Sequence, residues 1–456
     1  MKVLKKVAVF DLIGQFNHVV EFPSSHSFVV LHGPNGVGKT KLLELINATF
    51  SGEFFRVLQV PFTSIEFSFA DGYRLFVLRS GGQQILPGLD EGETLEERAL
   101  VFRLRDPEGS VQEWSFDNES LQYGDPRVRR VLERDFGIIY VGRDRWRLKT
   151  GELVETSELP MPMPSLYRKS YKGRPSDVIP EWLHSFLSET RVHLIETQRL
   201  LQPSRRSNKI PDGEGRHRKD TVSEFAEDLA SAIASALARN SRTSQKLDRT
   251  FPRRVLRKNP LPSNVTDDLI RERYEEQSRL REELEAISIL DNQDDIPLPE
   301  GGLENWEKRV LWVYLTDSAE KLATFETLLA RVRLLVEIVN SRFLNKKMAV
   351  DRERGFVFRT SVGREISAKQ LSSGEQHELV LVYDLLFNVP SNSLVLIDEP
   401  EISLHIAWQQ KFLADIERIA GLAGHRFVIA THSPQIVHKW WDRTVSLGSA
   451  VADEVE

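Results

Sequence analysis

The sequence contains no cysteine among its 456 residues. This absence excludes disulfide bonds, metal sites built on thiolates and cysteine nucleophiles. The sequence also has no run of about 18 uncharged apolar residues, the length that a membrane-spanning helix requires. Its apolar start is interrupted by Asp11 and no small-residue cleavage site follows, so we expect a first β-strand there and not a signal peptide. We therefore expect a cytoplasmic protein without membrane contact.

Positive charge is not in excess over the whole sequence, because 61 Lys+Arg against 67 Asp+Glu give a formal net charge of −6. The segment from Arg199 to Lys258 departs from this balance, with 15 Lys+Arg against 7 Asp+Glu and a local charge of +8. Such a segment could neutralise DNA phosphates, or it could dock on an acidic surface of the same chain or of a partner. Its basic residues include Arg205, Arg206, Lys209, Arg216, Arg218, Lys219, Arg253, Arg254, Arg257 and Lys258.

Strand and helix patterns alternate at both ends of the chain and indicate an α/β fold. Short β-branched and aromatic runs predict strands at residues 7–12, 27–31, 64–69, 73–78, 101–104, 348–350, 356–359, 394–397 and 427–430. Helices are expected over 40–50 and 181–190, and from Gly374 and Leu404 onward. The length allows roughly three structural units, which we place at residues 1–200, 201–345 and 346–456. The first and last would form the two lobes of one α/β core.

The insertion between these lobes has the pattern of several helices. A stripe of apolar residues predicts an amphipathic helix that contains Phe225, Leu229, Ile233 and Leu237. Two further helices are expected over 265–290 and 311–343, and the second carries a heptad seam. Residues 291–302 have the composition of a turn. We therefore expect an antiparallel helical hairpin that forms an arm of roughly 50 Å; a dimerisation zipper is the alternative for the seam.

A glycine-rich segment follows the predicted strand 27–31 and opens the predicted helix 40–50. Its residues fit the pattern G-x-x-x-x-G-K-[ST] and are Gly33, Pro34, Asn35, Gly36, Val37, Gly38, Lys39 and Thr40. In this pattern, backbone N–H groups and the helix N-terminus hold the phosphates of a nucleotide. We expect Lys39 to reach the β- and γ-phosphate oxygens and Thr40 to ligate Mg²⁺. The alternative is a glycine-rich turn that matches by chance.

Two adjacent carboxylates, Asp398 and Glu399, follow the apolar strand 394–397. Ligands of α/β sheets bind at the carboxyl ends of the strands, so this pair is expected near the phosphates. Asp398 would hold Mg²⁺ directly or through water, and Glu399 would act as general base toward the attacking water. An apolar strand followed by Asp-Glu is, by itself, more often a strand that ends in a solvated turn. Together with the glycine-rich segment, it indicates hydrolysis of Mg·ATP.

A third motif lies within Leu371–Gln376, and its Gly374 stands 24 residues before Asp398. This LS-x-GE segment, with Ser372, Ser373, Gly374 and Glu375, resembles the signature motif of ABC-type ATPases. The resemblance implies that the signature of one subunit caps the ATP held by the other. Ser372 and Gly374 would then contact the γ-phosphate in trans, helped by the N-terminus of the helix that they open. Two copies of the chain would therefore sandwich ATP.

The same resemblance assigns two more residues. His432 follows the predicted strand 427–430 and resembles the switch histidine that senses the γ-phosphate; the alternative is a polar residue at a strand end. Gln198 resembles the Q-loop glutamine, a ligand of Mg²⁺ or of water. It is separated from Lys39 by 159 residues, so a structural glutamine is the alternative. The resemblance thus implies catalytic roles for Lys39, Glu399 and His432, and metal binding by Thr40, Asp398 and Gln198.

The spacing of the motifs narrows the resemblance to one branch of these ATPases. The 335 residues between Lys39 and Gly374 far exceed the spacing in transporter ATPases. The chain is instead similar to the SMC, RecF and OLD branch, whose ATPase heads are split by a helical insertion. The segment from Asp398 to Gln409 resembles the DEPE-x-x-LH-x-x-WQ segment of OLD- and RecF-like ATPases in bacterial anti-phage systems. Among two-gene systems, the chain resembles the ATPase of PARIS first and that of Septu next, and no motif separates the two.

The resemblance implies a defence function. ATP-bound copies would assemble at least as a dimer, with larger assemblies an open alternative, and hold an effector nuclease of TOPRIM or HNH type. A phage-encoded trigger would release or activate this effector. The 24 residues after His432 are too few for a TOPRIM domain, so the effector is expected to be a separate protein. The alternative is a DNA-repair ATPase similar to RecF, which would clamp duplex DNA through the basic segment of the insertion.

Overall fold

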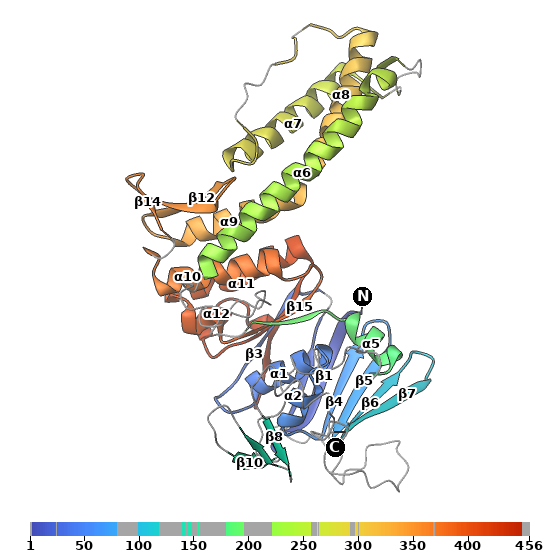
Figure 1. The fold of residues 1–456 in the computed structure, drawn as a ribbon, viewed down its shortest axis with the longest axis vertical. Helices are drawn as coiled ribbons and strands as arrows, with labels where there is room; N and C mark the ends of the chain where they lie inside the picture. Colours follow the sequence, from blue (N-terminus) through green and yellow to red (C-terminus); the bar gives the residue numbers. More distant parts are fainter. Residues whose placement is uncertain are drawn as a thin grey trace. The chain divides into compact units, whose positions relative to one another are not determined.

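In the computed structural model (Figure 1), the chain folds into two compact units. Unit 1 comprises residues 1–197, 390–402 and 424–456, and unit 2 comprises residues 198–389 and 403–423. The residues that the structure describes are 2–23, 25–79, 99–117, 139–142, 145–147, 153–155, 179–195, 221–256, 262, 264–291, 297–299, 301–367 and 370–448. The boundaries after residues 200 and 345 that the sequence suggests stay predictions.

A five-stranded parallel sheet forms one half of unit 1. In spatial order its strands are β11 (Val192–Ile195), β15 (Leu394–Asp398), β16 (Arg426–Ala430), β3 (Phe28–His32) and β17 (Thr444–Ser446). The three central strands are runs of Val, Leu, Ile and Phe that are almost wholly buried, as expected for parallel strands that are covered on both faces. The strands predicted at 27–31, 394–397 and 427–430 are confirmed to within one residue.

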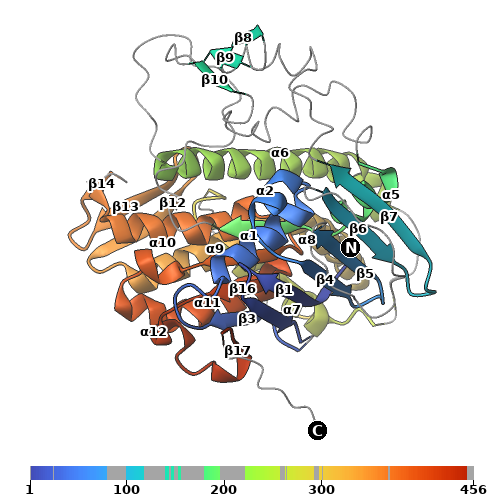
Figure 2. The same cartoon turned by 90° about the horizontal axis from the view of Figure 1, so that it is seen from below.

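An antiparallel sheet of six strands forms the other half of unit 1. Its order is β2 (Phe16–Glu21), β1 (Leu4–Leu12), β4 (Ser64–Phe69), β5 (Arg74–Arg79), β6 (Ala99–Arg105) and β7 (Val111–Asp117). Helix α1 (Lys39–Phe50) contacts β11 and β15 of the parallel sheet, and its Phe50 ring lies 5.0 Å from the Phe67 ring of β4. The apolar side of α1 therefore joins the two sheets in one core. Helix α2 (Phe54–Gln59) packs beside α1 (Figure 2).

Shorter elements complete the described part of unit 1. They are a small antiparallel sheet of β8 (Ile139–Gly142), β9 (Arg145–Arg147) and β10 (Leu153–Glu155), the helices α5 (Glu181–Ser188) and α12 (Pro434–Val437), and the turn η9 (Trp441–Arg443). The helix expected over 181–190 is thus confirmed as α5. Lys2 ties the N-terminal strand to the β4–β5 turn, because its ammonium bonds Asp71 at 2.6 Å and lies 3.4 Å from the centre of the Tyr73 ring.

Unit 2 is built mainly from helices. Its arm contains α6 (Thr221–Leu256), α7 (Asp267–Ala286), α8 (Asn305–Ala323) and α9 (Glu326–Arg342). The amphipathic helix expected around Leu229 and Ile233 is α6, in which both side chains are fully buried. None of the described helices is long and apolar enough to cross a membrane. The α/β fold with a helical insertion and a short antiparallel arm is confirmed, with two differences in the arm.

The first difference is that the heptad seam over 311–343 belongs to two helices, α8 and α9, and not to one. The break falls at Thr324 and Phe325. The Thr324 hydroxyl donates to the Lys321 carbonyl at 2.6 Å, and the Asn240 amide of α6 donates to the same carbonyl at 2.8 Å. Side-chain hydrogen bonds of this kind compete with the backbone bonds that continue a helix. The single helix predicted for this seam is therefore wrong.

The second difference concerns which helices pair. Contacts of Asp267 with Lys308 and of Gln277 with the Leu315 carbonyl show that α7 and α8 run parallel. The antiparallel partner of α8 is α6, as the bond of Asn240 to Lys321 and the ion pair of Arg254 with Asp317 show. The expected antiparallel hairpin of 265–290 with 311–343 is therefore wrong. The pattern of α7 is too weakly apolar to reveal its direction.

The remaining elements of unit 2 are α10 (Ser373–Tyr383), the π-helical turn η7 (Asp384–Asn388), α11 (Ile406–Ala423), and a three-stranded sheet of β12 (Lys346–Asp351), β13 (Gly355–Thr360) and β14 (Glu365–Ile366). The start of α6 packs closely on this sheet. A Cβ atom at Gly355 would lie only 1.9 Å from the Ala226 carbonyl oxygen, and the backbone φ there is +77°. Glycine at this position therefore permits the close approach of α6 to β13.

Three charged side chains from three helices meet in the interior of unit 2. Arg342 of α9 donates a hydrogen bond to Asp415 of α11, and Glu378 of α10 lies close enough for its charge to interact with both. Arg342 and Glu378 are 4% and 3% exposed. Burial raises the pKa of Glu378 to about 7, because desolvation penalises the ionised carboxylate more than the charge of Arg342 favours it. This buried charge cluster joins the arm to the helix that carries the LS-x-GE segment.

Candidate functional site

The carboxyl ends of three neighbouring parallel strands meet at one edge of the sheet in unit 1. Asp398 of β15 pairs in register with Ala430 of β16, and Ala430 pairs with Leu31 of β3. The segments that follow these strands carry the glycine-rich loop, the acidic pair and the Thr431–Ser433 turn. The structure therefore brings together the Lys39, Asp398 and His432 segments, which are up to 393 residues apart in sequence.

The glycine-rich loop connects β3 to α1. Gly38 is the N-cap of α1 and has a φ of +89°, and a Cβ atom there would lie 2.7 Å from a methyl carbon of Leu12. At Gly33, a Cβ atom would lie 2.2 Å from the Leu447 carbonyl oxygen. Both glycines are therefore required by the close packing of the loop. The first backbone N–H groups of α1 have no partner within the helix, and they can bind an anion.

Lys39 lies at the centre of this site, with a side chain that is almost wholly buried. Its ammonium donates to the carbonyl oxygens of Gly33 and Pro34, at 2.9 Å each, and lies 3.4 Å from His432 Nδ1. Burial lowers the pKa of Lys39, although the nearby charges of Glu399 and Asp398 act in the opposite direction. The lysine is thus held at the loop with carboxylates beside it, where anionic phosphates would stabilise its charge.

The acidic pair offers oxygen ligands next to Lys39. Burial raises the pKa of Asp398 and the charge of Glu399 adds to the rise, while a hydrogen bond with the Thr40 side chain opposes it. A divalent cation here would favour the ionised carboxylate. No group of three or more His, Cys, Asp or Glu in the described part of the chain could hold a metal by itself. Thr40 and Asp398 fit Mg²⁺, which takes few protein oxygens and completes its shell with phosphates and water.

Glu399 and His432 face each other across the ends of β15 and β16. His432 Nε2 lies 3.6 Å from Glu399 Oε1. The backbone at Glu399 has a φ of +44°, and its N–H donates to the Ala430 carbonyl at 2.8 Å. A positive φ is unfavourable for glutamate and is kept where the surrounding structure fixes it, often at functional sites. The turn directs this carboxylate toward the histidine and the phosphate loop, as a general base for water would require.

Two residues at the site were not predicted from the sequence. Glu401 accepts a hydrogen bond of 2.6 Å from the His432 backbone N–H, so it fixes the turn that carries the histidine. His18 of β2 is buried and its Nε2 lies 2.7 Å from the Val37 carbonyl oxygen of the phosphate loop. The sequence signal for Glu401 was its place in the DEPE-x-x-LH-x-x-WQ segment, from which no role was assigned to it. No signal existed for His18, because β2 itself was not predicted.

The LS-x-GE segment lies in unit 2 and opens α10. Ser372 is the N-cap, and it forms a capping box in which its hydroxyl accepts from the Glu375 N–H while the Glu375 carboxylate accepts from the Ser372 N–H. Lys346 of β12 bonds the same carboxylate at 2.7 Å. Burial raises the pKa of Glu375, but the bonds from Lys346 and Ser372 outweigh it and the net pKa is lowered. Ser373 and Gly374 form the exposed to half-buried first turn of this fixed helix.

Several predicted residues lie outside the described part of the chain. Gln198 is one of them, and so are the parts of the basic segment that precede and follow α6, residues 199–220 and 257–258. Of its quoted basic residues, Arg253 and Arg254 are described. Arg254 is engaged within the arm by its ion pair with Asp317. The role of Gln198 stays a prediction.

The fold and the site together identify the general class of this protein. A phosphate loop between a parallel strand and a helix, beside an acidic pair on a neighbouring strand, is the arrangement of a P-loop ATPase. The chain belongs to the family described as "AAA domain, putative AbiEii toxin, Type IV TA system", which matches residues 28–438. It is an ATPase. A segment of 84 residues is 36% identical to the "Retron Ec83 probable ATPase" of Escherichia coli, and this match covers 16% of the chain and 15% of that protein.

Among solved structures, the chain is similar to two SMC head domains. One is from Pyrococcus furiosus and was solved bound to the C-terminal domain of ScpA. It is 14% identical to this chain, the match covers 98% of this chain and 93% of that chain, and the TM-score is 0.35. The other is from Thermotoga maritima, with 10% identity, 95% and 91% covered, and a TM-score of 0.31. The family and the geometry of the site identify the class of this chain.

Proposed function

We propose that the chain binds and hydrolyses Mg·ATP between two copies of itself. In this proposal, Lys39 and the phosphate loop hold the β- and γ-phosphates, Thr40 and Asp398 bind Mg²⁺, and Glu399 accepts a proton from the attacking water. His432 senses the γ-phosphate, and Gln198 contributes to the metal site. The single observation that carries the proposal is that Lys39, Glu399 and His432 converge at one sheet edge. The Lys39 ammonium lies 3.4 Å from His432 Nδ1, and His432 Nε2 lies 3.6 Å from Glu399 Oε1.

The LS-x-GE segment supplies the second half of the proposed site. Ser372, Ser373 and Gly374 open a helix whose N-terminus favours negative charge. Glu375 is occupied by Lys346 and by the cap, so it shapes the turn and does not face the nucleotide as a free acid. We propose that this turn meets the γ-phosphate held by the other copy. A homodimer is then the smallest active assembly, and larger assemblies built from such dimers are compatible with it.

We further propose that this ATPase regulates a separate effector, a nuclease or toxin of TOPRIM or HNH type, in anti-phage defence. The family description names a putative toxin and a type IV TA system, and the relative in Escherichia coli is described as a probable retron ATPase. The DEPE-x-x-LH-x-x-WQ segment resembles OLD- and RecF-like ATPases of bacterial anti-phage systems. Overall length and the short arm, and not a motif, make AriA of the PARIS system the first candidate among two-gene systems and the Septu ATPase the next. A phage-encoded trigger would change the assembly and release or activate the effector.

Co-expression with the protein encoded by the neighbouring gene tests the defence proposal. We expect the two proteins to co-elute with Mg·ATP and the pair to protect cells from phage. Absence of both co-elution and protection would contradict this proposal and leave the ATPase site untouched.

The alternative function is a RecF-like DNA-repair ATPase that clamps duplex DNA. The +8 charge of the Arg199–Lys258 segment favours it. A RecF-like function predicts an affinity for duplex DNA that falls steeply as the salt concentration rises. This dependence of affinity on salt should become weaker when the arginines of the segment are replaced. No binding at low salt would exclude it.

A further inference from the structure

A groove runs between α6 and α7 of the arm. Both helices pack on α8, one antiparallel and one parallel to it, and they diverge from each other (Figure 1). The groove that remains between them has a volume of about 820 Å³. Its floor is α8, with Tyr314, Ser318 and Lys321, and its walls include Phe251 of α6 and Tyr274 of α7. Three helices around such a groove leave the place of the fourth helix of a bundle open.

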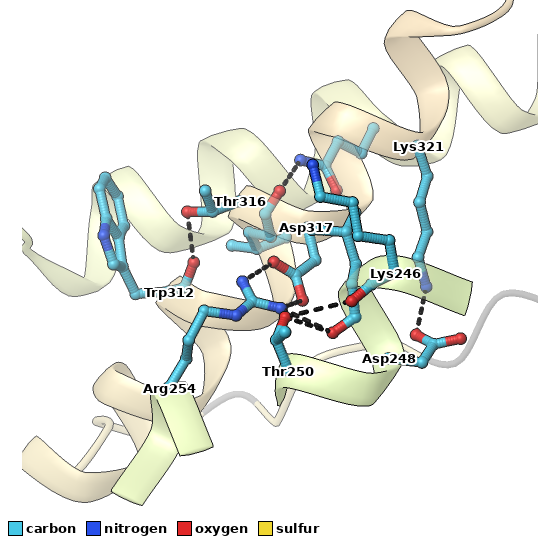
Figure 3. Close-up of polar contacts among 11 residues, drawn as sticks. Lys246, Asp248, Thr250, Arg254, Trp312, Thr316, Asp317 and Lys321 are labelled. Atoms are coloured by element: carbon cyan, nitrogen blue, oxygen red, sulfur yellow. Dashed lines mark hydrogen bonds and ion pairs between the residues drawn. The ribbon is translucent and has the colours of Figure 1, made fainter. Parts of the chain in front are cut away.

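Polar contacts to α8 fix both walls of the groove. Arg254 of α6 forms a bidentate ion pair with Asp317, which is buried, and Lys321 bonds Asp248 at 2.8 Å (Figure 3). On the α7 side, the buried amide of Gln277 donates to the Leu315 carbonyl at 2.8 Å. Bidentate and buried hydrogen bonds of this kind set the register of the helices that they join. The groove is therefore preformed, and a ligand would not have to open it.

The lining of the groove combines aromatic rings with acidic groups. Tyr314 is 43% exposed on the floor, which is unusual for an aromatic residue of a helix that is packed on two sides. The acidic residues along the groove are Asp248, Glu282, Glu285 and Asp291. The last three also line an adjoining open hollow of about 1090 Å³, together with Asp351 and Glu353. The basic residues of the same lining are Arg281, Lys321 and Arg352, of which Lys321 pairs with Asp248 and Arg352 with Asp291. The groove thus has a half-apolar floor and a rim in which carboxylates outnumber basic side chains.

We infer that this groove docks a basic amphipathic helix of a separate protein. The apolar face of such a helix would cover the rings of Phe251, Tyr274 and Tyr314, and its Lys or Arg side chains would pair with the acidic rim. The rim carboxylates would repel nucleic-acid phosphates. The inference rests on the proposed function for the existence of a protein partner, and it adds where that partner binds and what chemistry it presents.

Two peptides and one DNA duplex test the docking surface without any knowledge of the natural partner. The probe is a fluorescent helical peptide of Leu and Lys in a heptad pattern; the comparison ligands are the same peptide with Glu for Lys, and duplex DNA. The groove variant is the full chain with Glu282→Lys and Glu285→Lys. The matched control carries Glu272→Lys and Glu275→Lys, which change the same charge on the same helix at exposed positions away from the groove lining.

We expect the Leu/Lys peptide to bind the wild type and the control with similar Kd, and the groove variant at least about tenfold more weakly. Equal weakening in both variants would show a general charge effect and overturn the inference, as would tighter binding of DNA or of the Glu peptide. ATPase activity of the same preparations is read in parallel. Normal ATPase activity without a preference for the Leu/Lys peptide would contradict the docking surface alone. Absence of ATPase activity would contradict the proposed ATPase site.

A cross-link to the groove wall gives a second readout that does not depend on charge reversal. Because the chain has no cysteine, Glu282→Cys, at an exposed position that lines the groove, provides a unique thiol for a benzophenone-maleimide label. Glu275→Cys is its control. Irradiation with the Leu/Lys peptide should cross-link the peptide to the chain from position 282 and not from position 275. Equal labelling at both positions, or cross-linking of two copies of the chain to each other, would overturn the inference.

Discussion

Replacement of Glu399 by glutamine is expected to lower the kcat for ATP hydrolysis by about 10²–10⁴-fold, the range for loss of a general base. The affinity for Mg·ATP should change little, because the amide keeps the size of the side chain and the phosphate loop, Lys39 and Asp398 are unaltered. The φ of +44° at this position is also kept. Phosphate release at saturating ATP, with nucleotide binding read by a fluorescent ATP analogue, separates the two effects.

The control for this substitution is Glu21→Gln, an exposed carboxylate of unit 1 on the edge strand β2. It should keep the kcat of the wild type. If Glu399→Gln retained a third or more of the wild-type kcat, Glu399 would not be the base. A large loss of ATP affinity with an unchanged kcat would assign Glu399 to binding in place of catalysis.

Replacement of Glu378 by glutamine is expected to stabilise the chain, and more so at higher pH. The pKa of Glu378 is raised from its ordinary value of 4.5 to about 7 by burial. Between these values the folded chain binds a proton that the unfolded chain has released, so this carboxyl group destabilises the fold progressively as pH rises from about 4.5 to about 7. Glutamine stays neutral and removes the penalty. The gain should grow from about 1 kcal/mol near pH 5.5 to about 3 kcal/mol near pH 8.5.

Urea unfolding at the two pH values measures this gain. Glu326→Gln, at the exposed start of α9, is the control and should show no such dependence on pH. A variant that is less stable than the wild type at the higher pH would mean that Glu378 is ionised in the fold and paired productively with Arg342. The prediction would then be wrong, and the buried charge cluster would be a stabilising network instead.

The site in unit 1 could be predicted because each of its parts has a local pattern. Buried runs of β-branched residues mark the strands before Gly33 and Asp398, and the glycine spacing of the phosphate loop is required by close contacts that only glycine permits. The rule that ligands bind at the carboxyl ends of parallel strands placed the acidic pair near the phosphate loop. The order of β15, β16 and β3 in the sheet was not predicted. The role of Glu401 was not predicted, because its carboxylate accepts a hydrogen bond from a backbone N–H group 31 positions away in the sequence.

The arm could be predicted only in part. The apolar stripe of α6 was clear, and Leu229 and Ile233 are buried as that stripe requires. The break at Thr324 depends on Asn240 of another helix, which no local pattern shows. The direction of α7 is set by long-range polar contacts such as that of Arg281 with Ser318. The short turn that was expected at 291–302 favoured a hairpin, but the described ends of this segment lie at opposite ends of α7. Asp291 pairs with Arg352 after β12, whereas the Pro299 and Gly301 carbonyls accept hydrogen bonds from Arg271 near the start of α7.

Complementation between two inactive chains tests the shared ATP site most directly. Lys39→Ala removes the phosphate contact, and Gly374→Asp places a negative charge in the first turn of α10, where it suits the helix dipole but repels a γ-phosphate. Each variant alone should be inactive. A one-to-one mixture should recover about a quarter of the wild-type ATPase activity, because half of the dimers are mixed and each holds one intact site. A mixture as inactive as its folded components, or a Gly374→Asp chain that hydrolyses ATP alone, would contradict a site shared between two copies.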